Sequence, residues 1–144
     1  MECSETIHVD APPAQVWPII EQVEAWPTWT ASMKKIKRLG QHGDALAVGD
    51  SARVKQPGFA AAKWTVTEVV PGRSFAWQSK VPGLLSVGEH EVVADGAGSS
   101  VTLTFRQTGV LSGLLERLYG KRAASYVKME VDGVKRQSEA SVSR

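Results

Sequence analysis

Cysteine is nearly missing from this chain, which has only Cys3 among its 144 residues. A lone cysteine cannot form an internal disulfide, so the chain is compatible with a reducing compartment. Zinc sites built from cysteine pairs are excluded as well. The three histidines, His8, His42 and His90, lack the spacing of metal ligands, and we therefore expect no metal site.

Long apolar runs are also missing. No stretch approaches the roughly 20 consecutive apolar residues that a membrane-spanning helix needs. The opening residues MECSETIHVD lack the basic, then apolar, then small-residue pattern of a secretory signal. We therefore expect a cytoplasmic protein without a membrane span.

Motifs of common catalytic and nucleotide-binding sites are absent. The chain contains no G-x-S-x-G, H-E-x-x-H or G-x-x-x-x-G-K-[ST]. The net charge is only +2 and there is no arginine-rich run, so we expect no nucleic-acid partner. The densest basic run, KKIKR at 34–38, is interpreted as a solvated strand face. Peripheral contact with anionic lipid or an acidic partner is the alternative.

What the chain does have is enough apolar residues, 42%, for a sizeable core. Its length fits a single domain spanning 1–144, and its polar tail, at about 138–144, is expected to fray. The alternation in ETIHVD predicts a strand. A helix is predicted next, from the apolar stripe of Val16, Ile19, Ile20 and Val23.

Two prolines divide this helical region. Pro18 removes one helix hydrogen bond and should kink or shorten the first helix. In the stretch EAWPTWT, Pro27 disfavours helix at Trp26 but can begin a new turn, so a short second helix is predicted at 26–31.

Six strand-like segments follow, separated by turn sequences such as QPG, VPGR and DGAG. Consecutive strands with short links form an antiparallel meander. From Leu111 to about Gln137 the period is helical again, and this long helix must bury its apolar face against the sheet. The predicted strands are 33–39, 50–56, 62–70, 73–80, 85–94 and 100–108.

This order of elements resembles the Bet v 1-like superfamily, also called START-like or SRPBCC, and within it the bacterial polyketide cyclase/dehydrase-type proteins. Four stretches carry the resemblance, which covers nearly the whole chain: IHVDAPPAQVWPIIEQVEAWPTW, VGD, WTVTEVVPGRSFAW and GSSVTLTFRQTG. The resemblance implies an α+β helix-grip fold. In that fold a curved antiparallel sheet of about seven strands, with two short helices, wraps around a long C-terminal helix. A cavity between sheet and helix, and no cofactor or metal, are implied as well.

Strand parity predicts which aromatic rings face the long helix. With a two-residue turn at 71–72, Glu68 opposes Phe75, and Trp64 and Trp77 share the same inner face. Such rings either fill the core or line a cavity. Trp17, beside the apolar stripe of the first helix, is expected to be core.

Apolar residues also gather in loops at one end of the meander, in QPGFAAA, KVPGLLS and TGVLSGLL. Clustered apolar loop tips indicate a ligand mouth or a docking patch, unless they fold inward and plug the end. We expect Trp26 to pack as core between the two short helices and Trp29 to form the rim of the cavity at this end. The predicted ligand-binding residues are Trp29, Phe59, Trp64, Trp77, Leu85, His90, Phe105, Leu111, Leu115 and Tyr119.

Three polar residues, His90, Glu68 and Arg122, are candidate catalytic groups. A four-residue loop at 95–98 would put His90 on the inner face, where it could polarise a carbonyl, act as acid or base, or be structural. Glu68 could reach solvent instead, because it lies near a turn. Arg122 and Glu130 fall within the apolar arc of the long helix. There Arg122 could meet an acidic headgroup, snorkel or pair with a carboxylate.

Three functions therefore remain open. The first is binding of a hydrophobic small molecule, such as a lipid, a quinone or a polyketide-like aromatic. The second is a cofactor-free cyclase or dehydratase, which also needs polar groups with shifted pKa values converging on the cavity. The third is a protein-interaction module that uses the apolar loop end and has no sizeable cavity. The sequence indicates no particular oligomeric state.

Overall fold

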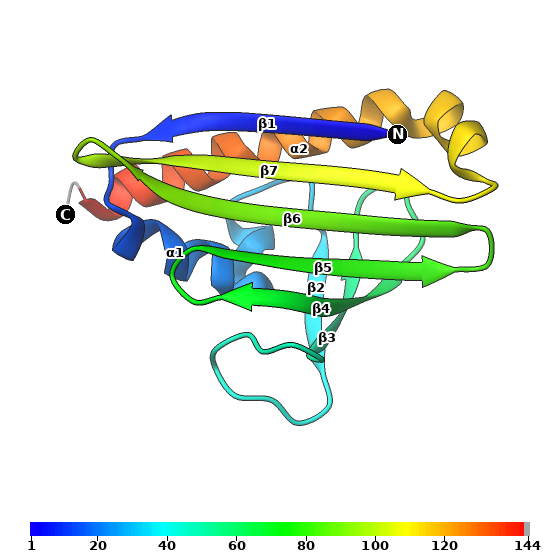
Figure 1. Ribbon diagram of the computed structural model, residues 1–144, viewed down its shortest axis with the longest axis horizontal. Coiled ribbons are helices and arrows are strands. Elements are labelled where there is room, and N and C mark those ends of the chain that lie inside the picture. The colour runs from blue at the N-terminus through cyan, green and yellow to red at the C-terminus, as the bar shows by residue number, and fades with distance from the viewer. Residues whose placement is uncertain (143–144) are drawn as a thin grey trace.

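A curved antiparallel sheet forms one layer of the protein (Figure 1). The computed structural model describes residues 1–142. The seven strands lie in the order β1-β7-β6-β5-β4-β3-β2. Figure 1 shows β2 and β3 running steeply across the direction of the long strands, which is how the sheet curls. The strands are β1 (Glu2–Val9), β2 (Lys35–Leu39), β3 (Ser51–Lys55), β4 (Ala62–Val70), β5 (Ser74–Val81), β6 (Leu84–Asp95) and β7 (Gly98–Thr108).

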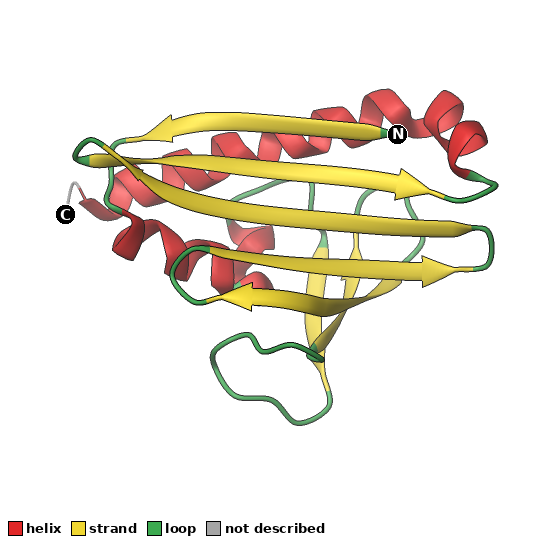
Figure 2. Ribbon diagram, in the orientation of Figure 1, coloured by secondary structure: helices red, strands yellow, loops and turns green. Residues whose placement is uncertain are grey.

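Helices form the second layer (Figure 2). They are α1 (Pro13–Glu21), the 3-10 helix η1 (Val23–Thr28) and the long α2 (Ser112–Val142). The long helix runs along β1 and β7 and also contacts α1. This arrangement is the predicted α+β helix-grip fold.

Both chain ends are more regular than the sequence predicts. Strand β1 begins at Glu2, ahead of ETIHVD, and α2 continues to Val142. Residues 138–142 of the predicted frayed tail are thus helical. Ser138 is fully buried, and the Glu139 carboxylate accepts a hydrogen bond from the backbone N–H of Asp10 at 2.9 Å. The last two residues of that tail lie outside the described residues, and the single-domain assignment stays a prediction.

The second short helix differs from its prediction in type and position. It is a 3-10 helix that ends at Thr28, and Pro27 lies inside it rather than beginning it. The backbone N–H groups of Trp29 and Thr30 both donate to the Trp26 carbonyl, at 3.0 Å. These bonds close the turn directly after Pro27. The first helix contains Pro18 and is nine residues long, in line with the prediction of a short helix.

The β4–β5 hairpin has a longer turn than predicted. Val70 pairs with Ser74, so the turn has three residues, 71–73, instead of two. A bulge between Val66 and Glu68 then shifts the register by one residue. Beyond the bulge Val66 pairs with Trp77, which is the predicted partner.

The three-residue turn changes the placement of one candidate residue. Glu68 pairs with Ala76 rather than with Phe75, and its side chain is exposed on the outer face of the sheet. Because a one-residue change in register moves a side chain to the other face, the error in the turn length put Glu68 on the wrong side.

A glycine brings α2 close to the loop after η1. At Gly133 a Cβ atom would lie 2.6 Å from Cε3 and 2.8 Å from the carbonyl oxygen of Trp29. One turn later, Nη2 of Arg136 donates to the same carbonyl oxygen at 2.8 Å. The helix therefore packs directly on the backbone at Trp29, which fixes where η1 and its tryptophans lie.

Replacing Gly133 with alanine should lower the free energy of unfolding by about 1–3 kcal/mol, because the new methyl group overlaps a backbone atom. Gly120→Ala is the matched control in the same helix. Its Cβ would meet only the flexible Glu116 side chain, at 3.4 Å. There alanine should raise stability by up to about 1 kcal/mol through helix propensity. Urea unfolding of both variants checks the pair, and equal gains would show that α2 is not closely packed at Gly133.

Candidate functional site

A cavity of about 350 Å³ lies between the concave face of the sheet and α2. Side chains from β3 to β7, from η1, from the loop at 56–61 and from α2 form its walls. Small-molecule sites in proteins have volumes of about 300–1,000 Å³. The cavity is therefore large enough for a compact organic ligand.

Small inward-facing residues on the central strands leave this space open. Ser79 on β5 pairs with Ser86 on β6, and both line the cavity. The next inward pair is Trp77 and Gly88. A Cβ at Gly88 would lie 3.1 Å from Nε1 of Trp77, so the glycine makes room for the indole ring. Larger side chains in this row would fill the space between sheet and helix.

Aromatic rings form two groups in the wall. Trp64 and Trp77 lie on the concave face, as strand parity predicts, with ring centroids 5.7 Å apart. Trp26 extends this group from η1, with its centroid 5.5 Å from that of Trp77. On the other side Phe59 contacts Tyr119 of α2 at 5.5 Å. Together with aliphatic neighbours, these rings make most of the wall apolar.

His90 is the buried polar group on the sheet side. Its ring stacks on Phe75 at 4.2 Å, and Nδ1 lies 3.3 Å from the Phe75 carbonyl oxygen. Because a carbonyl can only accept, Nδ1 must be the donor and Nε2 carries the free lone pair. Burial lowers the pKa of His90 to about 4. At neutral pH His90 is thus a neutral hydrogen-bond acceptor in the cavity wall.

Glu130 is the buried polar group on the helix side. Its side chain is 8% exposed and lines the cavity. Ser32 Oγ donates to Glu130 Oε1 at 3.3 Å and lies 2.8 Å from Thr30 Oγ1. Burial raises the pKa of Glu130 to about 7, although the Ser32 hydrogen bond opposes this shift. Near neutral pH the carboxyl group is present in both forms and can donate or accept a hydrogen bond.

The structure places seven of the ten predicted ligand-binding residues in the cavity wall. They are Phe59, Trp64, Trp77, His90, Phe105, Leu115 and Tyr119. His90 pairs with Leu103, as the predicted loop at 95–98 requires. A role for these residues in binding stays a prediction.

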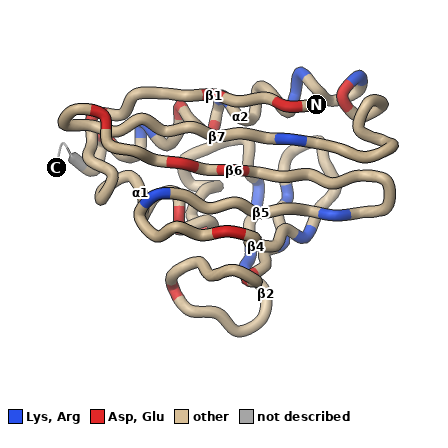
Figure 3. The backbone as a smooth tube through the Cα atoms, in the orientation of Figure 1, with Lys and Arg blue, Asp and Glu red and all other residues tan. Residues whose placement is uncertain are grey.

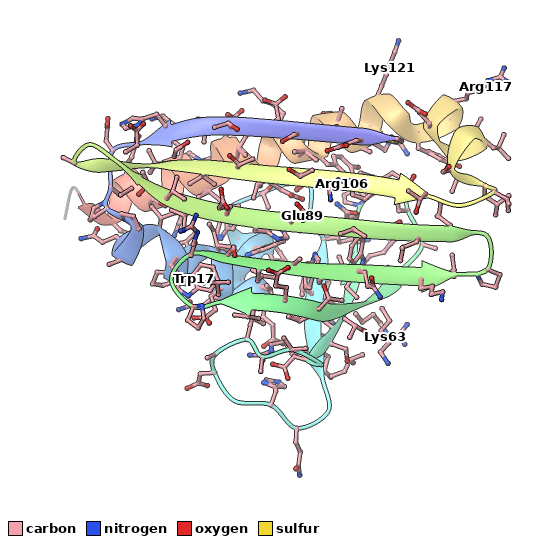
Figure 4. The ribbon with its side chains drawn as sticks, in the orientation of Figure 1. Trp17, Lys63, Glu89, Arg106, Arg117 and Lys121 are labelled. Carbon is pink, nitrogen blue, oxygen red and sulfur yellow. The ribbon has the colours of Figure 1, made fainter. Side chains whose placement is uncertain are left out.

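Of the two tryptophans of EAWPTWT, Trp26 is buried in the core as expected, but Trp29 does not lie at the rim of the cavity. Trp26 lines the cavity, whereas Trp29 is packed against Gly133 and is 7% exposed. Trp29 was expected at the rim, but it lies outside the wall because the close approach of α2 covers it. Trp17 is buried outside the cavity wall with its ring edge-on to Phe75, at the end of the molecule opposite Arg117 (Figure 4).

Two more predicted ligand-binding residues lie outside the wall. Leu85 pairs with Lys80 and points outward, because it alternates with the inward Leu84 and Ser86. Leu111 lies at the start of α2 against Gly83 and is 42% exposed.

Only one of the three candidate catalytic residues lines the cavity. His90 lines the cavity, while Glu68 is on the outer face. Arg122 is exposed on α2, with its guanidinium 5.9 Å from the centre of the Phe59 ring, and does not line the cavity. The sequence marks both Arg122 and Glu130 as charges within an apolar arc. The packing of α2 against the sheet shows that Glu130, and not Arg122, lies in the cavity wall.

Solved structures with the same architecture match almost the whole chain. A hypothetical protein from Helicobacter pylori, jhp0584, superposes with a TM-score of 0.82 at 15% identity, covering 96% of this chain and 88% of that one. Ara h 8.0201 gives 0.66 at 14% identity, with 99% and 97% covered. The di-domain ARO/CYC BexL from the BE-7585A biosynthetic pathway gives 0.68 at 17% identity, with 94% of this chain and 45% of BexL covered. At these identities the likeness shows the fold.

The curved sheet, the gripped helix and the cavity between them define a Bet v 1-like protein of the SRPBCC type. The family model described as "Polyketide cyclase / dehydrase and lipid transport" matches residues 1–139, and the chain belongs to this family. No curated protein matches the chain in sequence. None of the helices within residues 1–142 is long and apolar enough to cross a membrane.

Proposed function

We propose that this protein binds a hydrophobic small molecule, such as a lipid, a quinone or a polyketide-like aromatic, in the cavity between the sheet and α2. The observation that carries the proposal is the cavity itself, about 350 Å³ in volume and walled mostly by apolar and aromatic side chains. Membership in a family of cyclases, dehydrases and lipid transporters supports it. A cytoplasmic location remains part of this proposal.

Two polar groups in the wall would orient the ligand. His90 offers a lone pair on Nε2, and the Glu130 carboxyl can donate or accept. A ligand with an apolar body and a hydroxyl or carbonyl group would satisfy both. In an apolar site, a few such groups provide most of the orientation and selectivity.

Filling part of the cavity should weaken binding strongly without unfolding the protein. Ser79→Leu adds an apolar side chain to a position that lines the cavity. We expect its affinity for the uncharged fluorescent probe N-phenyl-1-naphthylamine to fall at least tenfold, because the leucine occupies the space of the ligand. The melting temperature should change little, since the added carbons occupy empty volume. Fluorescence titration and thermal unfolding measure the two effects.

Ala94→Leu is the control for this experiment. Ala94 is exposed and does not line the cavity, so the added side chain should leave probe affinity unchanged. Equal affinity in wild type and Ser79→Leu would show that the probe binds elsewhere, and the proposal would lose its basis.

Catalysis is the second candidate function, and one observation favours it. His90 and Glu130 line the same cavity, and burial shifts their pKa values in opposite directions, to about 4 and about 7. Pairs of titratable groups with divergent pKa values are typical of acid–base sites. A cyclase or dehydratase acting on a polyketide-like chain would need both, so Glu130→Gln and His90→Phe should each remove turnover while the probe still binds.

A further inference from the structure

Six large apolar side chains are exposed at one end of the molecule, where the β5–β6 turn meets the first turns of α2. We call this group the apolar tip. Its members, which are between 37% and 90% exposed, are Val81, Val110, Leu111, Leu114, Leu118 and Tyr119. Such clustering is uncommon on a protein surface that has no partner.

The apolar tip is one continuous surface. The backbone N–H of Leu111 donates to the Gly83 carbonyl at 3.0 Å, which ties the start of α2 to the β5–β6 turn. Leu111 directly precedes α2, and Leu114 and Leu118 follow it at helical spacing within the helix. Leu115, which is four residues after Leu111 and three before Leu118, borders this surface on the same side of the helix and lines the cavity.

The tip is therefore next to the cavity. Tyr119 and Val81 belong to both, because each is an exposed member of the tip and also lines the cavity. Whatever covers the tip would also lie against this part of the cavity wall.

Positive charge surrounds the tip. Arg117 and Lys121 project from the first turns of α2 away from the sheet (Figure 4), and Lys80 is exposed beside Val81. Figure 3 shows lysine and arginine positions (blue) on this part of α2 and toward the same end of β5. Within residues 109–122 there are three cations and a single carboxylate, Glu116. Among the described residues, neither Arg117 nor Lys121 forms an ion pair.

We propose that the apolar tip docks on an anionic lipid bilayer, with its leucines in the acyl boundary and the surrounding cations on lipid phosphates. An apolar helix surface bordered by lysine and arginine has the chemistry of interfacial membrane binding. A second copy of the chain fits the tip poorly, because two positively charged surfaces would repel each other. Docking would turn the adjoining part of the cavity toward the membrane. The proposal rests on the exposed tip and does not require the proposed ligand.

Vesicle flotation tests the proposal with the intact chain. We expect the protein to float with vesicles of 70% phosphatidylcholine and 30% phosphatidylglycerol, to bind pure phosphatidylcholine much less, and to be released by 0.5 M salt. Leu114→Ser combined with Leu118→Ser should reduce binding at least fivefold. Arg117→Gln combined with Lys121→Gln should reduce it roughly tenfold or more, since each cation near an anionic surface contributes to binding.

Matched controls separate docking from general charge. Lys35→Gln combined with Lys37→Gln makes the same change in net charge on exposed positions of β2 and should leave vesicle binding nearly unchanged. Val48→Ser removes an exposed apolar side chain, 66% accessible, from the loop between β2 and β3 and should also have no effect. Circular dichroism and urea unfolding verify that each variant is folded.

Three results would overturn the proposal. The first is no flotation of the wild type with anionic vesicles. The second is an equal loss for the Arg117/Lys121 pair and the Lys35/Lys37 pair, which would mean that net charge or the KKIKR run, rather than the tip, attracts the vesicles. The third is a wild-type dimer, seen by light scattering, that Leu114→Ser with Leu118→Ser makes monomeric, because the tip would then bind a second copy. None of these results depends on whether the cavity binds the fluorescent probe.

Discussion

Trp26→Ala is expected to lower the free energy of unfolding by about 3–5 kcal/mol and to weaken probe binding about tenfold or more. The Trp26 side chain is 2% exposed, and Nε1 donates to the Ile20 carbonyl at 3.1 Å. Its removal would leave a large void and an unpaired carbonyl, and would also remove part of the cavity wall. The ring has four aromatic neighbours: Trp29, Phe75, Trp77 and His90.

Trp29→Ala is the comparison that separates stability from binding. Trp29 is also buried, so its replacement by alanine should lower the free energy of unfolding by a similar amount. It does not line the cavity, however, and probe affinity should stay within about twofold of wild type. Urea unfolding and fluorescence titration at low temperature, where both variants remain folded, give the two quantities. If Trp29→Ala weakened probe binding as much as Trp26→Ala, Trp29 would have to contact the probe, and the cavity wall described here would be wrong at this point.

The positions of Trp26 and Trp29 relative to the cavity could not be predicted from the sequence. Helical spacing gives the angle between Trp26 and Trp29 but not the direction in which the pair points. That direction depends on η1 being a 3-10 turn and on Gly133, more than 100 residues away, letting α2 cover Trp29. A contact between distant segments leaves no local signal at either of them.

The fold itself was predictable for the opposite reason. Apolar periodicity, prolines and turn sequences are local, and they placed the seven strands and the long helix close to their observed bounds. One turn length was enough to misplace Glu68, because strand parity carries an error of one residue along the strand until the bulge at Val66 cancels it. The predicted register of β6 and β7 was correct, although the turn has two residues, 96–97, rather than four, and His90 consequently faces inward.

Glu130 lines the cavity but was not among the site residues predicted from the sequence. A carboxylate within an apolar arc is a recognisable pattern, but Arg122 shows the same pattern and is exposed. The difference is that Glu130 lies where α2 passes the buried side chains of Thr30 and Ser32, and Ser32 supplies its hydrogen bond. This partner comes from a loop, whose position periodicity cannot predict.

Glu130 should make the protein less stable as the pH rises from about 4.5 to about 7. Its pKa is raised from 4.5 to about 7 by burial. In this window the unfolded chain releases a proton that the folded chain keeps, so stability falls with rising pH, by about 3 kcal/mol in all.

His90 should act in the opposite direction. Burial lowers its pKa from 6.5 to about 4. As the pH falls from 6.5 to 4, the unfolded chain takes up a proton that the folded chain excludes, so stability falls with falling pH, again by about 3 kcal/mol. The two slopes overlap between about pH 4.5 and 6.5, and there they should nearly cancel.

Replacing either residue should therefore reveal the pH dependence of stability that the other residue contributes. Glu130→Gln keeps an amide oxygen for Ser32 but no longer titrates, so its stability should rise steeply with pH from 4.5 to 6.5 relative to wild type. His90→Phe should show the reverse slope, with stability falling up to about pH 7. Urea unfolding at half-unit pH steps measures these slopes. All other titrating groups, including the exposed His8 beside Asp10 and Asp95, contribute equally and drop out of the difference.

Parallel pH curves for wild type and Glu130→Gln would mean that Glu130 titrates normally and is solvated through the cavity. That outcome would remove the pKa argument for catalysis but not the cavity. With opposite slopes, the pair is instead held in its uncharged forms, Glu130 protonated and His90 neutral, across the acidic half of the range. A proton donor and a proton acceptor would then line one apolar space, which is the condition for binding a neutral oxygen-bearing ligand without burying a charge.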